Sequence, residues 1–129
     1  MPAKEDFPLI FEHLKKIMKK YEKKLKVQAD TKDNYCLIGP FSERFKKELW
    51  FGAVQIKKNY VSYHLMPVYM YREIALGVPV DLKKRMQGKS CFNFNKFDKG
   101  LFKELAEFTD ASFKLFVKRG DDITLTYKN

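Results

Sequence analysis

The chain has few of the residues that mark secreted, membrane-spanning or metal-binding proteins. Its 129 residues include only two cysteines, Cys36 and Cys91, too few for a disulfide-stapled secreted scaffold or a four-ligand zinc site. It has no long uncharged apolar stretch, and its first residues, MPAKEDFPLI, lack the basic start and apolar centre of a secretory signal. We therefore expect reduced thiols, a cytoplasmic location and no membrane span.

Complete catalytic and metal-binding motifs are also missing. Gly88-Lys89-Ser90 matches the end of a phosphate-binding loop, but that motif needs a glycine five residues earlier, where the chain has Lys83. A strand is also expected after these residues, where the motif requires a helix. We expect no enzyme activity, no cofactor and no metal site.

The chain does have a strong positive charge. Its formal net charge is +10 and its pI is about 9.5, which favours association with nucleic acid, an anionic membrane surface or an acidic protein. The composition, 45% hydrophobic and 33% charged, is that of a globular protein. The length suits a single domain over residues 1–129.

Much of the charge lies on a predicted first helix, which we expect Asp6 to cap. Apolar residues recur on one stripe of this helix: Phe7, Ile10, Phe11, Leu14, Ile17, Met18 and Tyr21. Lysines occupy the opposite side. This pattern fits either a solvated amphipathic helix or a surface that binds a polyanion.

Two hairpins are predicted next. The first pairs residues 25–29 with 35–38, and Gly39-Pro40 should end it. The second pairs 49–57 with 60–66 around a Lys58-Asn59 turn, which places residue 56 opposite 61, 54 opposite 63, and 52 opposite 65.

Alternation along the second hairpin predicts two faces of different character. The core face carries Trp50, Val54, Ile56, Val61, Tyr63 and Leu65. The other face carries Phe51, Ala53, Gln55, Lys57, Tyr60, Ser62, His64 and Met66. This second face is either half-solvated or a binding site.

Further elements follow to the end of the chain. We expect a helix over 72–76 ended by Gly77, a helix over 81–87 followed by a left-handed Gly88, and a strand over 89–94. The last helix should run from Asp98 to Arg119. It has two apolar stripes, so either it breaks at 109–112 or the second stripe packs on the tail or on another subunit. The protein is then a monomer or a homodimer, and the tail, 120–129, can add an edge strand.

The segments NYVSYHLMPVY and MQGKSCFNF resemble the YdhG-like family. This is a set of small bacterial domains of largely unknown function, some members of which have been likened to frataxin in fold. The resemblance covers roughly residues 5–119. It implies an α+β fold: an antiparallel sheet of about five strands, with N- and C-terminal helices on one face, as in a frataxin-like sandwich. The analogy with frataxin also suggests iron binding, which relies on a clustered acidic ridge on the first helix and strand. Here that helix is rich in lysine and the acidic residues are spread out.

Two functions are left by the sequence. The first is a module that binds a small ligand or a protein on the open sheet face, through Phe51, Gln55, Tyr60, Ser62, His64, Cys91 and Asn93. The alternative is a nucleic-acid or polyanion binder that uses Lys15, Lys16, Lys19, Lys23, Lys83, Lys84 and Arg85. A nucleophilic pair of Cys91 and His64 is a third idea, but no motif supplies the groups that would orient it.

Overall fold

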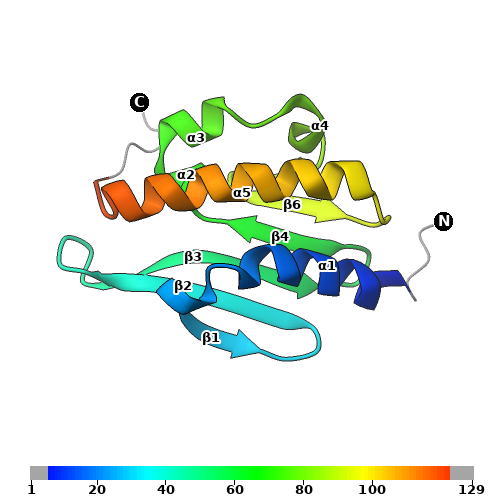
Figure 1. Cartoon of the computed structure of the whole chain (residues 1–129), viewed down its shortest axis with the longest axis horizontal. Coiled ribbons are helices and arrows are strands. Elements are labelled where there is room, and N and C mark those ends of the chain that lie inside the picture. The colour runs from blue at the N-terminus through cyan, green and yellow to red at the C-terminus, as the bar shows by residue number, and fades with distance from the viewer. Residues whose placement is uncertain (1–5, 123–129) are drawn as a thin grey trace.

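The computed structural model describes residues 6–122 as an α+β fold with one antiparallel sheet (Figure 1). The helices are α1 (Phe7–Lys19), the 3-10 turn η2 (Glu22–Lys24), α2 (Pro67–Met70), α3 (Arg72–Leu76), α4 (Val80–Lys83) and α5 (Lys99–Arg119). The strands are β1 (Lys26–Asp30), β2 (Asn34–Ser42), β3 (Lys47–Ile56), β4 (Val61–Leu65), β5 (Met86–Gln87) and β6 (Cys91–Phe94).

The six strands are ordered β1-β2-β3-β4-β6-β5. Helices α1 and α5 run side by side across one face of this sheet, and α2 and α4 contact α5 (Figure 1). The predicted fold class, an antiparallel sheet with the first and last helices on one face, is confirmed at this level. The sheet has six strands where about five were expected.

Helix α1 packs on the sheet through the stripe that the sequence predicts. Phe7, Ile10, Phe11, Leu14 and Met18 are all buried, as expected for apolar residues that recur every three to four positions. Asp6 occupies the N-cap position, but its side chain makes no capping hydrogen bond. The capping role predicted for Asp6 is therefore wrong.

The register of the second hairpin is confirmed. Ile56 pairs with Val61, Val54 with Tyr63, and Gly52 with Leu65. The first hairpin is longer than predicted, because β2 continues past Gly39-Pro40 to Ser42. The ladder between β2 and β3 is irregular at those two residues, and Pro40 is exposed, as is usual for a proline within a sheet, which cannot donate to the ladder.

A β-bulge in β3 reverses the predicted orientation of Trp50 and Phe51. Leu37 pairs with Gly52 and Ile38 with Trp50, which leaves Phe51 as an extra residue in β3. Such an extra residue interrupts the alternation of side chains. Phe51 is fully buried and contacts the rings of Phe113 and Phe116 in α5. Trp50 is 36% exposed and lies on the opposite face, so both predicted orientations are wrong.

The helix predicted over 81–87 is also shorter than expected. Helix α4 ends at Lys83, and Met86 and Gln87 pair with Phe92 and Cys91 as strand β5. Gly88 has the predicted positive φ, 75°, but it serves the β5–β6 turn. The helix predicted over 72–76 is confirmed as α3, with Gly77 at its C-cap.

Helix α5 is unbroken. Asp98 caps it by accepting a hydrogen bond from the backbone N–H of Leu101 at 3.0 Å. Two polar side chains at the residues where a break was considered have hydrogen-bond partners: Thr109 Oγ1 lies 2.7 Å from Tyr63 Oη in β4, and Ser112 Oγ donates to the Phe108 carbonyl. The edge strand suggested for the tail lies mostly outside the described residues, because residues 123–129 are not among them.

Candidate ligand site on the open sheet face

One row of residues crosses the sheet on the face turned away from α1 and α5, here called the open face. Direct pairing between neighbouring strands joins Ala29, Cys36, Ala53, His64 and Cys91 in that order. Cys36 and Cys91 are three strand spacings apart, roughly 14 Å, which is beyond the reach of a disulfide. Both are free thiols.

Trp50 lies over the middle of this row. Its indole Nε1 donates a hydrogen bond to the Cys36 thiol, and its ring lies against the imidazole of His64 with centroids 4.5 Å apart and planes 30° apart. Ala53 stands between Cys36 and His64 in the row. A small side chain at this position leaves the space over the sheet that the indole fills.

His64 and Cys91 form a close but uncharged pair. Nδ1 of His64 lies 3.0 Å from Sγ of Cys91, and the Ser90 hydroxyl lies 3.3 Å from the same nitrogen. Burial lowers the pKa of His64 to about 4, and burial raises the pKa of the Cys91 thiol. Both shifts favour the neutral forms, whereas a nucleophilic cysteine needs its thiolate stabilised. The pair suits hydrogen bonding to a ligand better than nucleophilic attack.

A shallow hollow of about 220 Å³, here called the polar pocket, extends from Trp50 along β3, β4 and β6. Its lining includes six of the seven residues that the sequence predicts for a ligand site: Gln55, Tyr60, Ser62, His64, Cys91 and Asn93. Phe51 is not among them, because the bulge turns its side chain into the core. Trp50, Ala53, Lys57 and Gln87 complete the lining.

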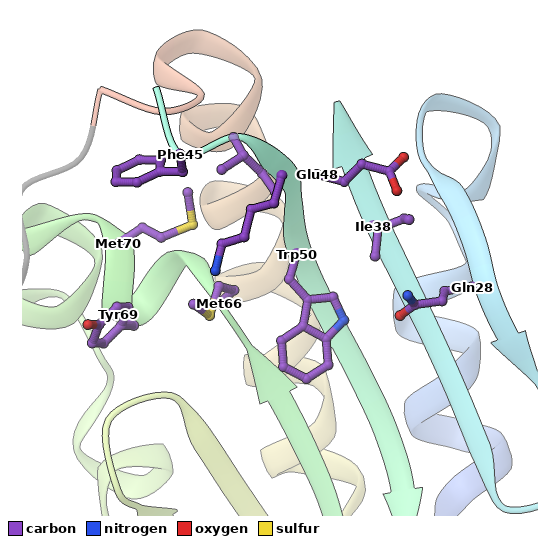
Figure 2. Close-up of a pocket in the computed structure, with 10 residues that line it drawn as sticks. Gln28, Ile38, Phe45, Glu48, Trp50, Met66, Tyr69 and Met70 are labelled. Atoms are coloured by element: carbon purple, nitrogen blue, oxygen red, sulfur yellow. The ribbon is translucent and has the colours of Figure 1, made fainter. Parts of the chain in front are cut away.

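A larger hollow of about 580 Å³, here called the apolar pocket, lies on the other side of Trp50 (Figure 2). Phe45 of the β2–β3 loop, Met66 at the end of β4, and Tyr69 and Met70 of α2 project toward it, with Trp50 on β3. Its size is that of pockets that hold small molecules, which are also lined mainly by apolar and aromatic groups. The lining is completed by Gln28, Ile38, Lys47, Glu48 and Leu49.

The sequence interpretation missed the apolar pocket. Met66 was placed on the correct face, but Phe45, Tyr69 and Met70 were not considered as site residues. Adjacent apolar residues in a loop and a short helix carry no periodic signal. Their meeting depends on the way that α2 folds back beside β3, which local sequence does not specify.

The basic residues of the alternative hypothesis occupy two separate elements. Lys15, Lys16 and Lys19 line a hollow of about 360 Å³ on α1, and Lys23 lies in η2. Lys15 is paired with Asp30 at 2.7 Å. The second group, Lys83, Lys84 and Arg85, is exposed at α4, and α5 runs between α4 and α1 in Figure 1. The two groups are therefore not one continuous strip.

Within residues 6–122, no group of three or more histidine, cysteine, aspartate or glutamate side chains is placed to hold a metal ion. None of the helices there is long and apolar enough to cross a membrane.

No protein-family description, no curated protein and no solved structure matches the chain.

Proposed function

We propose that this protein binds a small, largely apolar ligand on the open sheet face, against Trp50. The observation that carries the proposal is the position of this indole: it is the wall shared by the apolar and the polar pocket. An indole that is 36% exposed and lies between two hollows offers a large flat surface whose burial is favourable. The neutral state of His64 and Cys91 supports binding over nucleophilic chemistry.

The resemblance to the YdhG-like family is part of the same proposal. The segments that carry it, around residues 59–69 and 86–94, contain His64, Met66 and Tyr69 as well as Cys91. These residues line the two pockets. The same segments also contain core residues such as Val61, Tyr63 and Phe92, so the resemblance concerns the fold as much as the open face.

Phe45 offers the sharpest test, because it lines the apolar pocket yet is 38% exposed in a loop. N-phenyl-1-naphthylamine, a neutral dye that brightens in apolar surroundings, should bind the wild-type protein with micromolar affinity. Phe45→Ala removes one wall of the pocket and should weaken binding about 5- to 10-fold, which corresponds to about 1–1.4 kcal/mol. A fluorescence titration measures both affinities.

Phe41→Ala is the matched control. Phe41 is 56% exposed on β2 and does not line the apolar pocket, so its loss should leave the affinity unchanged. Absence of dye binding to the wild-type protein, or equal weakening by both substitutions, would contradict the proposal.

A second candidate function, polyanion binding, is favoured by the hollow on α1 that Lys15, Lys16 and Lys19 line. Binding of this kind releases counterions, so its affinity falls steeply as salt rises. Gel shifts with random DNA and RNA at low and moderate salt test it. Lys16→Gln together with Lys19→Gln should weaken any shift, and the absence of a shift at low salt would remove this candidate.

A further inference from the structure

The charges around the two pockets are unequal. The apolar pocket has one residue of each sign in its lining, Lys47 and Glu48, and Glu48 also lies 3.8 Å from Lys26. The polar pocket has Lys57 as the only charged residue in its described lining. The ammonium of Lys57 lies close enough to Cys91 to lower the pKa of that thiol, although burial acts more strongly in the opposite direction.

The other polar groups of the polar pocket complement this single cation. The Ser62 hydroxyl is hydrogen-bonded to the Cys91 thiol, and the amides of Gln55 and Asn93 donate one N–H each, to Asn34 Oδ1 and Gln87 Oε1. The second N–H of each amide and the Tyr60 hydroxyl can donate to a ligand. No aspartate or glutamate belongs to the described lining. A negatively charged group placed there would meet a cation and several donors without a carboxylate to repel it.

We propose that the ligand is an anionic amphiphile, whose apolar chain occupies the apolar pocket and whose negative head lies beside Lys57 in the polar pocket. Trp50 contacts both parts, since it lines both pockets. The inference rests on the proposed function, and it adds the sign and position of the head group. A carboxylate and a phosphate monoester share the chemistry that this pocket recognises.

Three twelve-carbon compounds below their micellar concentrations test the sign of the head: dodecanoate, dodecanol and dodecyltrimethylammonium. Dodecyl phosphate is a fourth probe, which distinguishes a phosphate from a carboxylate head. Each competes with N-phenyl-1-naphthylamine, and its dissociation constant follows from the loss of dye fluorescence. The two anions should bind more tightly than the alcohol, and the cationic compound most weakly.

Lys57→Gln and Lys58→Gln separate a positioned cation from the net charge of the protein. Both lysines are exposed and adjacent at the hairpin turn, and each substitution lowers the net charge by one. Lys57→Gln should weaken dodecanoate about 3- to 5-fold, the range of a partly exposed charge pair, and leave dodecanol unchanged. Lys58→Gln should change neither affinity.

The possible failures are distinguishable. Equal displacement by dodecanoate and dodecanol, or equal effects of the two lysine substitutions, would overturn the anionic head while the apolar site remained. Failure of the dye itself to bind would overturn the proposed function together with this inference. If both lysine variants lost the preference for dodecanoate equally, the preference would come from the net charge of the protein and not from the position of Lys57. That result would also contradict the proposal.

Discussion

At the scale of single residues, the open face depends on an imidazole that stays neutral. His64 is enclosed by Trp50 on one side and by Cys91 and Ser90 on the other. Burial holds its pKa near 4, compared with about 6.5 for an exposed histidine. A neutral imidazole can present its ring to Trp50 without placing a charge in a partly dry site.

The pKa of His64 predicts how stability changes with pH. Below about pH 6.5 the unfolded chain takes up a proton on His64, whereas the folded protein takes it up only near pH 4. The unfolded state therefore binds more protons over this range, and the folded state loses about 2 kcal/mol between pH 7 and pH 5. Urea unfolding of the wild type and of His64→Gln at both pH values measures this loss.

His64→Gln should remove that part of the pH dependence, whatever it does to stability at pH 7. His13→Gln is the control, since His13 is the chain's other histidine and is exposed on α1. Identical losses between pH 7 and pH 5 in the wild type and in His64→Gln would show that the imidazole is not desolvated.

At the scale of elements, the bulge in β3 decides which aromatic side chain faces which layer. Phe51 and Gly52 both lie on the side of the helices, where Phe51 meets α5 and Gly52 meets α1. A Cβ on Gly52 would come within 2.6 Å of the His64 carbonyl oxygen and 2.7 Å of Met18 Cε. The glycine therefore permits the close approach of α1 to the sheet beneath Trp50.

Gly52→Ala should destabilise the protein, because the backbone oxygen of His64 cannot move aside as a flexible side chain can. We expect a loss of about 1–3 kcal/mol in the free energy of unfolding, as for other overpacked core positions. Chemical denaturation measures it. Gly100→Ala in α5 is the control: the nearest atom to its Cβ would be 3.7 Å away, and alanine favours the helix.

A Gly52→Ala protein as stable as the wild type would contradict the close packing of α1 on β3. A destabilised variant that still binds the dye with the wild-type affinity would separate the packing role of Gly52 from the site.

The second hairpin shows what the sequence could and could not predict. Its register followed from the two-residue turn and from alternation, which are local properties. The orientation of Trp50 and Phe51 could not be predicted from these local properties. Either aromatic ring could fill the core, and alternation alone predicted that Trp50 does. Gly52 was the available signal, because an isolated glycine inside a strand indicates a bulge or a close backbone approach.

The part of the candidate site that lies on strands was predictable from the sequence. Gln55, Ser62, His64, Cys91 and Asn93 share a face because side chains alternate, and the pairing of β4 with β6 brings them together. The apolar pocket was not predictable in the same way. Phe45 and the residues of α2 reach it from a loop and a short helix, whose positions depend on tertiary packing.

At the scale of the whole molecule, the two faces of the sheet differ in how their side chains are packed. One side of the sheet is closed by α1 and α5 around a continuous core. On the other side Cys36, Ile38 and Ala53 form a small second cluster, beside which Trp50 separates the two pockets. The net charge of +10 is distributed over the helices and turns, so that it draws anions toward the molecule without selecting a site.

The methionine methyl groups provide the most direct test of binding at the open face. Among the described residues, Met66 and Met70 line the apolar pocket, Met18 is buried between α1 and β3, and Met86 lies in β5. An NMR titration of protein labelled with ¹³C at the methionine methyls, with dodecanoate as the ligand, reports on these positions at once. We predict saturable shifts of the Met66 and Met70 methyl signals, with those of Met18 and Met86 nearly unchanged. Shifts confined to other methionines, or no shift at any of them, would contradict this prediction.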